Sequence, residues 1–359
     1  MTIRVVIMAG GTGGHVFPAL AVANELRRRD VIVSWIGTKR GLESEVIPTA
    51  DIPIDWVSIS GLRGNGLLGW LSAPYRLIVA VYQVMRVFKK RKPDVVLGMG
   101  GFVSGPGGLA ARLVKTPLVI HEQNSIPGLT NKLLSKIAQK ILVAFPSAFA
   151  EKMQTENTGN PLRADFSSFA EPEQRLNIHK GVLHLLVIGG SLGASVLNKV
   201  VPEALAKFEL TERPKIWHQT GKKHLEQTND YYGNANVDAR IEAFIDNMSE
   251  AYGWADLVLC RAGALTISEL SAVGVGSILV PYPFAVDDHQ TKNAQYLVDA
   301  GAAELIQQTD FSREKLYGLL VMFGKQKNKL LHMANQARGL ARPNATSEVA
   351  DYCMELANV

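Results

Sequence analysis

The feature that most constrains this chain is a pair of glycine-rich turns, each set between an apolar run and a helical stretch. The first follows Arg4–Met8 and reads Ala9-Gly-Gly-Thr-Gly-Gly-His15, and the second follows Leu185–Ile188 and reads Gly189-Gly-Ser-Leu-Gly-Ala194. Such turns bring bare backbone N–H groups to a helix N-terminus, whose partial positive charge suits a phosphate. Two of them facing each other across a cleft would hold a nucleotide and an acceptor, which favours an enzyme of nucleotide sugars.

Short apolar runs alternate with helical stretches along the whole sequence. Most of these runs are apolar throughout, as expected for parallel strands buried on both faces. The expected strands are Arg4–Met8, Val31–Ile36, Ile54–Ile59, Val95–Met99, Leu118–His121, Lys140–Ala144, Leu183–Ile188, Lys215–Gln219, Arg240–Ile245, Leu257–Cys260, Ser277–Val280 and Ala303–Ile306. The alternation predicts an α/β fold with one doubly wound, Rossmann-like sheet in each half.

The length of 359 residues fits two domains of ordinary size. The candidate linker begins at Gly159-Asn-Pro-Leu-Arg163 and continues into a polar stretch. We therefore expect an N-terminal domain over residues 1–160 and a C-terminal domain over residues 161–343. Residues 344–359 are expected to form a helix that packs back on the N-terminal domain.

The net charge of +5 conceals an asymmetry between the halves. Residues 1–150 hold 18 Lys+Arg against 8 Asp+Glu, and residues 151–359 hold 20 against 25. Residues 61–92 contain seven basic residues and no acidic one. A local excess of this kind indicates either an anionic partner, such as a membrane surface or a nucleic acid, or a solvated helix face.

Residues 67–92 have the pattern of an amphipathic helix. At helical spacing one apolar stripe contains Leu77, Ile78, Val81, Met85 and Phe88, with a basic rim and the apolar stretch 67–71 ahead of it. Such a helix either packs on the sheet or lies in a lipid headgroup layer. The Leu-Leu-Gly-Trp-Leu stretch favours the membrane contact.

Several common classes of protein are disfavoured. The two cysteines, Cys260 and Cys353, form no CxxC pair, which argues against a disulfide framework or a zinc site. The chain enters a strand without a leader, and no apolar run is long enough to span a bilayer, so we expect a cytoplasmic protein. Neither glycine turn spells the dinucleotide fingerprint G-x-G-x-x-G, and no P-loop is present.

Other motifs leave alternatives open. The second turn matches G-x-S-x-G, so a hydrolase with Ser191 as nucleophile, Asp256 or Asp287 and His289 is one alternative. Thr266 and Glu269 have the spacing of a capping box, although a carboxylate inside a helix at the carboxyl edge of a sheet also suits the two hydroxyls of a ribose. Asp287-Asp288-His289 lacks the further carboxylates of a metal site and serves equally as a helix start.

Two more motifs follow strands of the first half. His121-Glu-Gln-Asn124 ends one strand, and Gly98-Met-Gly-Gly-Phe-Val-Ser-Gly-Pro-Gly-Gly108 follows another. The carboxyl ends of strands are where open α/β sheets bind ligands. His15 opens the helix after the first turn, and in a cleft it is a candidate general base.

Taken in order, these motifs closely resemble the MurG family of bacterial transferases, which add N-acetylglucosamine to undecaprenyl-pyrophosphoryl-N-acetylmuramyl-pentapeptide. The likeness runs essentially end to end. It implies two domains of the GT-B type facing across a cleft, with the donor held mainly by the C-terminal domain. Leu192 and His289 depart from the family pattern, which has Gln at the first position and, in some members, at the second.

The resemblance also implies roles for individual residues. Ile245 meets the uracil through its backbone, and Glu269 binds the ribose. The binding residues that it implies for UDP-N-acetylglucosamine are Thr12, Gly13, Gly14, Asn124, Arg163, Ser191, Ile245, Ala264, Leu265, Thr266, Ile267, Ser268, Glu269 and Gln290. Within this set Ser191, the Ala264–Ser268 turn and Arg163 cradle the pyrophosphate, and Gln290 and Asn124 address the sugar.

The implied reaction inverts the anomeric centre, with His15 as first candidate base and Glu122 as second. No metal and no cofactor are expected. The implied partners are UDP-N-acetylglucosamine, the lipid-linked acceptor and the anionic inner leaflet, with no nucleic acid, so the protein is expected on the cytoplasmic face of the bacterial inner membrane as a peripheral protein. The alternatives are another GT-B lipid glycosyltransferase, a nucleotide-sugar epimerase, and a nucleotide-binding scaffold without chemistry.

Overall fold

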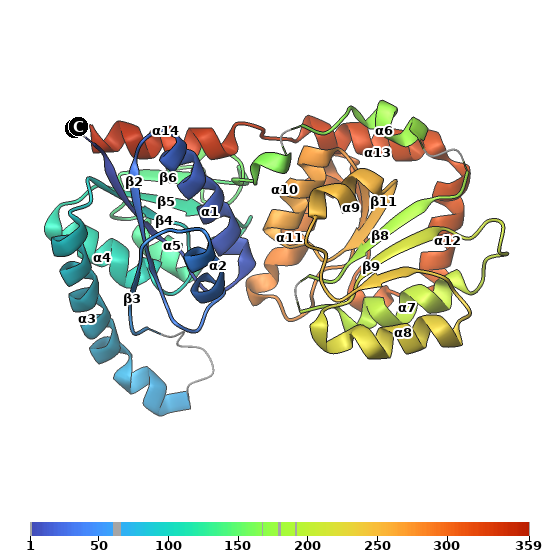
Figure 1. Cartoon of the computed structure of the whole chain (residues 1–359), viewed down its shortest axis with the longest axis horizontal. Coiled ribbons are helices and arrows are strands. Elements are labelled where there is room, and N and C mark those ends of the chain that lie inside the picture. Colours follow the sequence, from blue (N-terminus) through green and yellow to red (C-terminus); the bar gives the residue numbers. More distant parts are fainter. Residues whose placement is uncertain (1, 60–65, 167, 179–180, 191, 359) are drawn as a thin grey trace. The chain divides into compact units, whose positions relative to one another are not determined.

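A computed structural model describes residues 2–59, 66–166, 168–178, 181–190 and 192–358 (Figure 1). The chain forms two compact units. Unit 1 contains residues 1–164 and 342–359, and unit 2 contains residues 165–341. Each unit has its own parallel sheet with helices on both faces, so the predicted pair of doubly wound α/β domains is confirmed.

Unit 1 is built on a seven-stranded parallel sheet in the order β3-β2-β1-β4-β5-β6-β7. Its strands are β1 (Arg4–Met8), β2 (Ile32–Gly37), β3 (Ile54–Trp56), β4 (Val95–Gly98), β5 (Leu118–Glu122), β6 (Lys140–Val143) and β7 (Glu156–Asn157). Its helices are α1 (Gly13–Arg28), α2 (Glu43–Thr49), α3 (Gly66–Arg91), α4 (Ser104–Val114), α5 (Leu129–Leu134) and α14 (Ala345–Ala357). Helix α14 packs on α1 and buries Val349, Ala350 and Cys353 in the core of this unit.

Unit 2 has a six-stranded parallel sheet in the order β10-β9-β8-β11-β12-β13. Its strands are β8 (His184–Ile188), β9 (Lys215–Gln219), β10 (Arg240–Glu242), β11 (Leu257–Cys260), β12 (Gly276–Leu279) and β13 (Ala303–Leu305). Its helices are α6 (Pro172–Ile178), α7 (Ser195–Leu205), α8 (Leu225–Asn234), α9 (Met248–Trp254), α10 (Ala264–Val273), α11 (His289–Asp299), α12 (Arg313–Lys325) and α13 (Lys327–Gly339).

The central strands are buried along their whole length, which explains why their sequences are apolar rather than alternating. In unit 1, Val5 pairs with Val33 of β2 on one side and with Val95 of β4 on the other. All twelve predicted strands are present with ends shifted by a few residues. The short edge strand β7 was not predicted.

Both sheets reverse their strand order beside the first strand of the unit. In unit 1 this switch point lies between β1 and β4, and in unit 2 between β8 and β11. Ligands of open α/β sheets bind outside the carboxyl ends of the strands at such a point. The glycine-rich turn after β1, the second turn after β4 and the glycine turn after β8 all begin there.

Helix α3 corrects one expectation. Val81 and Phe88, at the C-terminal end of the predicted apolar stripe, are buried against the sheet with Met85 beside them. Ile78 of the same stripe is 67% exposed, as are Tyr75 and Tyr82 at 71% and 62%. The side chains of the stretch 67–71 lie outside the described residues. Helical periodicity identifies an apolar stripe but does not show what the stripe packs on. In α3 the sheet covers the part from Val81 to Phe88 and leaves Leu77 and Ile78 exposed.

Candidate functional site

A buried carboxylate, that of Glu43, accepts a hydrogen bond from the first glycine turn of unit 1 and so holds the turn in place. Thr12 is the N-cap of α1, and Gly13 and Gly14 are its first two residues. The backbone N–H of Gly11 donates to Glu43 Oε2 at 2.9 Å, while Thr38 donates to Glu43 Oε1 from both its N–H and its hydroxyl, at 2.9 and 2.8 Å. Glu43 is fully buried. The sequence analysis did not identify this support, because Glu43 lies on α2, 32 residues after Gly11.

The second glycine turn of unit 1 packs directly on the first. Gly100 and Gly101 have φ angles of +95° and +81°. A Cβ atom on Gly101 would stand 2.3 Å from the carbonyl oxygen of Gly10, and one on Gly100 would stand 2.6 Å from His15 Nδ1. Glycine is therefore required at both positions, by the backbone conformation and by the close approach.

His15 is tied to the end of β5 by a run of hydrogen bonds. Its Nδ1 lies 2.9 Å from Gln123 Oε1, and Gln123 Nε2 lies 3.1 Å from His121 Nδ1. His121 Nε2 in turn lies 2.9 Å from the carbonyl oxygen of Gly159. We call these four residues the His15–Gly159 network. His121 and Gln123 are buried, whereas His15 is half-buried.

Burial lowers the pKa of His121 to about 4, and the charge of His15 lowers it further, whereas the hydrogen bond that His121 donates to the Gly159 carbonyl raises it. His121 is therefore neutral near pH 7. A neutral imidazole has one N–H donor and one acceptor nitrogen, so it can only pair with groups of matching kind.

Glu122 points away from this network and binds a loop instead. Its Oε1 accepts from the N–H and the side-chain amide of Asn124, and its Oε2 accepts from the N–H of Gly128 and from Asn131 Nδ2 at 2.9 Å. Glu122 is 2% exposed. A buried carboxylate that already has four donors positions Asn124 and the turn before α5. This arrangement favours His15 over Glu122 as the base.

The glycine turn of unit 2 is equally tight. A Cβ atom on Gly193, whose φ is +78°, would stand 1.9 Å from the carbonyl oxygen of Thr220. Gln219 joins this turn to the segment after β10, since its Nε2 donates to the carbonyl of Gly190 at 3.1 Å and its Oε1 accepts from the N–H of Ile245 at 2.9 Å. Because Gln219 already accepts from the N–H of Ile245, a ligand at this segment would contact the carbonyl of Ile245 or displace the side chain of Gln219 from that N–H. Ser191 lies outside the described residues.

Helix α10 begins straight after β11, with Gly263 as its N-cap, so Ala264, Leu265, Thr266, Ile267 and Ser268 form its first turns. The capping-box alternative is wrong, because Thr266 lies inside the helix and Glu269 accepts from Tyr252 Oη at 2.9 Å. Tyr252 is fully buried while Glu269 is half-buried. Tyr252 therefore orients the carboxylate of Glu269, which lies in the first two turns of α10 at the carboxyl edge of the sheet.

Gln290 lies on the first turn of α11 and is oriented by the backbone. Its Oε1 accepts from the N–H of Tyr282 at 2.9 Å and of Ala262 at 3.3 Å. No residue in the described ranges accepts from its Nε2, which is left to donate to a ligand. Next to it, Arg261 donates to the carbonyls of Val280 and Pro281, at 3.0 Å each, and fixes the loop before α11.

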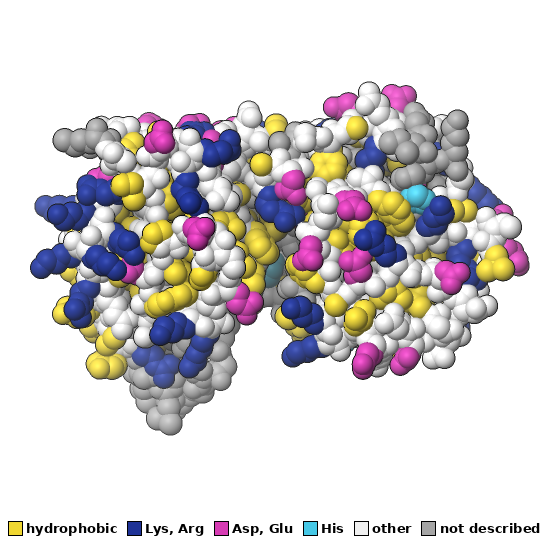
Figure 2. All heavy atoms as spheres, viewed as in Figure 1, with side chains coloured by type: hydrophobic (Ala, Val, Ile, Leu, Met, Phe, Trp, Pro, Cys, Tyr) yellow, Lys and Arg dark blue, Asp and Glu magenta, His cyan; other side chains and the backbone are white. Residues whose placement is uncertain are grey.

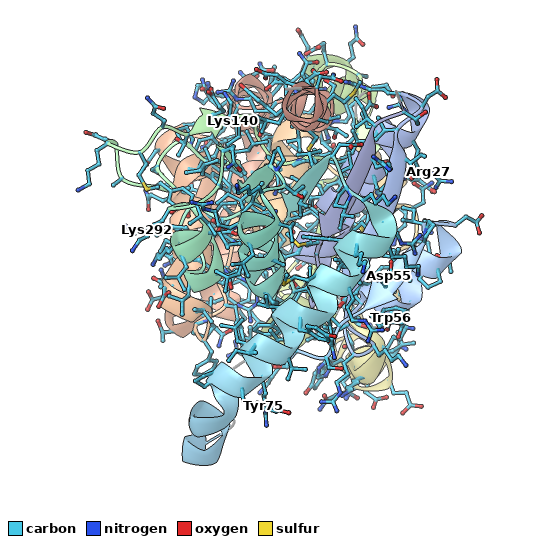
Figure 3. All side chains as sticks on the ribbon, turned by 90° about the vertical axis from the view of Figure 1, so that its left-hand side faces the viewer. Arg27, Asp55, Trp56, Tyr75, Lys140 and Lys292 are labelled. Atoms are coloured by element: carbon cyan, nitrogen blue, oxygen red, sulfur yellow. The ribbon has the colours of Figure 1, made fainter. Side chains whose placement is uncertain are left out.

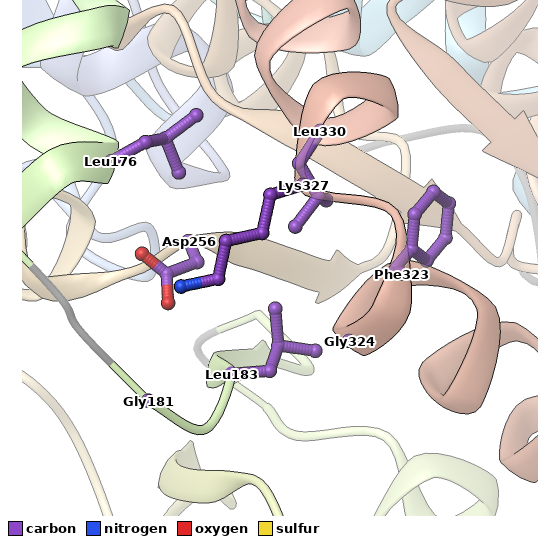
Figure 4. Close-up of a pocket in the computed structure, with 8 residues that line it drawn as sticks. All are labelled: Leu176, Gly181, Leu183, Asp256, Phe323, Gly324, Lys327 and Leu330. Carbon is purple, nitrogen blue, oxygen red and sulfur yellow. The ribbon is translucent and has the colours of Figure 1, made fainter.

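The remaining candidates lie elsewhere. Asp256 accepts from the backbone N–H of His184 at the amino ends of the strands, opposite the edge that carries the glycine turn, which removes it from a hydrolase triad with Ser191. It faces Lys327 in a small cavity of about 20 Å³, with room for roughly one water, lined also by Leu176, Leu183 and Phe323 (Figure 4). Arg163 is exposed at the end of unit 1. The described residues contain no cluster of three or more His, Cys, Asp or Glu side chains suited to a metal ion.

One face of unit 1 combines exposed apolar and basic side chains. Helices α3, α4 and α5 pack side by side, and Figure 2 shows Lys and Arg gathered on the side of unit 1 where α3 and α4 lie. Figure 3 looks onto that side, with Tyr75 near one end of α3. The exposed members of this α3–α5 face are Tyr75, Arg76, Ile78, Tyr82, Arg86, Lys89, Arg112, Leu113, Lys115, Leu129, Lys132 and Leu133. Among the described residues, no helix has the length and apolar character needed to cross a bilayer.

Comparison with known proteins gives matches in both units. The glycosyltransferase family 28 N-terminal domain matches residues 5–143, and the family 28 C-terminal domain matches residues 184–351. The chain is 51% identical to a UDP-N-acetylglucosamine--N-acetylmuramyl-(pentapeptide) pyrophosphoryl-undecaprenol N-acetylglucosamine transferase of Nitrosococcus oceani, covering 100% of both chains. It is 52% identical to the enzyme of the same name from Marinobacter nauticus, over 99% and 98% of the two chains.

A solved structure agrees with these relatives. The crystal structure of MurG from Acinetobacter baumannii superposes with a TM-score of 0.85 at 41% identity, and the match covers 98% of this chain and 99% of that one. The similarity therefore extends through both units.

Proposed function

This chain belongs to glycosyltransferase family 28, and from that membership we propose how its residues carry out a sugar transfer. The chain is a hexosyltransferase that moves N-acetylglucosamine from UDP-N-acetylglucosamine to N-acetylmuramyl-(pentapeptide) pyrophosphoryl-undecaprenol, a step of peptidoglycan synthesis. The observation that carries this conclusion is identity of about one half along the full length of enzymes that bear this name.

The acceptor hydroxyl needs a base, and His15 is our candidate. Its imidazole stands at the switch point of unit 1, half-buried, with Thr12, Gly13 and Gly14 just ahead of it on the same turn. In an inverting transfer the hydroxyl oxygen attacks the anomeric carbon in line while UDP departs with the electron pair of the broken bond. A base that takes the hydroxyl proton is worth roughly 10²–10⁴ in rate.

Unit 2 supplies the groups that we propose for the donor. Glu269, oriented by Tyr252, accepts the ribose hydroxyls, and the backbone of Ile245 contacts the uracil. The first turns of α10, from Ala264 to Ser268, offer N–H groups and a helix dipole to the pyrophosphate. We propose that Ser191 of unit 2 and Arg163, which belongs to unit 1, also contact the pyrophosphate.

The sugar itself is addressed by two amides. Gln290 presents its Nε2 after both its oxygen contacts are taken by backbone N–H groups, and Asn124 is oriented by Glu122. Amides held in this way can distinguish the substituents of a hexose, because an unpaired buried amide costs free energy when the right partner is missing.

We also propose that the α3–α5 face brings the enzyme to its lipid-linked acceptor. Exposed aromatic and aliphatic side chains surrounded by lysines and arginines suit the anionic surface of the inner leaflet, and each basic residue near such a surface contributes about 1 kcal/mol. The protein would then be peripheral on the cytoplasmic side of the inner membrane.

The deciding experiment measures UDP release from UDP-N-acetylglucosamine with and without a prenyl-pyrophosphoryl muramyl-pentapeptide. We expect release that depends on this acceptor. Release with diacylglycerol instead would identify another lipid glycosyltransferase. Acceptor-independent conversion of the sugar would identify an epimerase, and binding without turnover would identify a scaffold. Each of the last three results contradicts the assignment.

A further inference from the structure

The His15–Gly159 network has only one consistent arrangement of protons. It starts at the carbonyl oxygen of Gly159, which can only accept a hydrogen bond. His121 Nε2 must therefore carry the hydrogen. Because His121 is buried and neutral near pH 7, its Nδ1 holds a lone pair and accepts from an N–H.

Gln123 transmits this choice to His15. Its Nε2 donates to His121 Nδ1 and also lies 3.3 Å from the carbonyl oxygen of His121, so the amide nitrogen faces two acceptors. The amide oxygen then faces His15 Nδ1 at 2.9 Å and can only accept. It follows that His15 carries its hydrogen on Nδ1 and has its lone pair on Nε2.

We propose that Gln123 and His121 are positioning residues that hold the proton of His15 on Nδ1, so that Nε2 is the nitrogen that takes the proton of the acceptor hydroxyl. This rests on the proposed role of His15 as base. When the hydroxyl oxygen bonds to the anomeric carbon, its proton moves to Nε2, and the bond from that carbon to the UDP oxygen breaks with its electron pair leaving on UDP.

The network suits both protonation states of His15. The imidazolium still donates from Nδ1 to Gln123, so the ring keeps its contacts through the cycle. Gln123 has no titratable proton, and His121 stays neutral, so the network orients His15 and carries no proton away. Gly100 adds a second restraint, since its missing side chain lets the backbone lie against the ring at Nδ1 and Cε1.

The first test reads the tautomer directly and needs no turnover. The full-length protein is labelled with ¹⁵N-histidine, and long-range ¹H–¹⁵N spectra at neutral pH separate the two tautomers. The signals of His15 and His121, among eight histidines, are assigned from their loss in His15→Gln and His121→Gln. We expect Nδ1–H for His15 and Nε2–H for His121. Nε2–H on His15 would overturn the proposal.

The second test is kinetic. Gln123→Met removes both hydrogen bonds, and we expect kcat to fall by about 10- to 10²-fold, less than the roughly 10²–10⁴ that loss of a base costs, with the KM for UDP-N-acetylglucosamine nearly unchanged. Gln123→Glu keeps an acceptor for His15 Nδ1 and should retain more of the kcat. Gln139→Met, a glutamine of the same unit that accepts only from the N–H of Leu118, is the matched control.

A kcat for Gln123→Met equal to that of Gln139→Met would overturn the proposal, as would a higher KM with unchanged kcat. The proposed function fails differently. If His15 has the expected tautomer but His15→Ala keeps normal turnover, the base is another group, and the arrangement has no catalytic purpose.

Discussion

Each unit buries one histidine beside its glycine turn, and the hydrogen-bond networks of these two histidines lead to different groups. In unit 1 His121 connects through Gln123 to His15, a half-buried imidazole at the carboxyl edge of the sheet. In unit 2 the Nε2 of His218 donates to Asn198 Oδ1 at 3.1 Å, and its Nδ1 accepts from Tyr232 Oη at 2.9 Å. Asn198 Nδ2 then donates to the carbonyl of Thr220.

The difference separates chemistry from binding. The network of unit 2 closes on a backbone carbonyl that lies against Gly193, so it supports the shape of a turn. The network of unit 1 leaves one nitrogen of His15 without a partner among the described residues, so it orients an imidazole that can still accept a proton. With the same strand order, the network of unit 2 supports a turn, whereas that of unit 1 orients the residue that we propose as the base.

The largest effect is expected from His15→Ala. If unit 1 holds the base, kcat falls by roughly 10²–10⁴, while the Kd for UDP-N-acetylglucosamine changes little, because we propose that the donor is held mainly by unit 2. Turnover and calorimetric binding are measured on the same preparation. Near-normal turnover would remove the distinction between the units, and a lost donor affinity would assign His15 to binding.

Acid should destabilise both units through their buried histidines. Burial lowers the pKa of His121 to about 4 and that of His218 to about 3, below the unfolded value of 6.5. Between these values the unfolded chain binds more protons, so stability falls as the pH drops below about 6.5. At pH 5 each histidine costs about 2 kcal/mol.

The measurement is urea unfolding at about pH 7 and about pH 5, with His121→Gln and His218→Gln each expected to flatten the pH dependence of its own unit. A free energy of unfolding that is the same at both pH values in the wild-type protein would show that these histidines are not neutral in the fold.

Glu269→Ala should act on binding alone. Loss of a hydrogen bond to a charged group costs about 1.5–3 kcal/mol, or roughly 10- to 150-fold in donor Kd. Saturating donor should restore most of the turnover. The control is Glu250→Ala, an exposed glutamate on α9 of the same unit. Unchanged donor affinity with a lower melting temperature would mean that Glu269 serves only to pair with Tyr252.

The sequence predicts the fold well because the decisive signals are local. Apolar runs, glycine turns and the alternation of strands with helices are all read within short windows, and they were sufficient to find twelve strands. The edge strand β7 was not predicted because it has only two residues, Glu156 and Asn157, and neither is apolar. In α3 the apolar stripe was predicted, but its periodicity left open whether the sheet or a lipid layer covers it, because the sequence of a helix does not show which strands it packs on.

The site is less predictable because its supports are remote in sequence. Glu43 acts on Gly11 across 32 residues, and Gln123 acts on His15 across 108. Within His121-Glu-Gln-Asn124 the sequence analysis selected Glu122 and Asn124 as site residues. The residues that connect to His15 are instead Gln123, which contacts it directly, and His121, which contacts Gln123. Alternation along the end of β5 sends His121 and Gln123 to one side and Glu122 to the other.

The smallest effect concerns the outer surfaces of the two units. Unit 1 contains 21 Lys+Arg against 13 Asp+Glu, and unit 2 contains 17 against 20. This difference suits an anionic surface that contacts unit 1.

If only the α3–α5 face meets lipid, Leu113→Glu should weaken binding to anionic vesicles by about 1 kcal/mol, or roughly five-fold. The substitution removes a leucine that would be partly buried in the lipid layer and adds a charge of the same sign as the vesicle. Leu210→Glu, at a leucine of unit 2 that is 76% exposed against 62% for Leu113, should change nothing. Sedimentation with anionic and neutral vesicles measures both, and high salt should weaken the wild-type binding. Equal losses from the two variants would mean that charge alone drives adsorption and that unit 1 has no lipid-facing surface of its own.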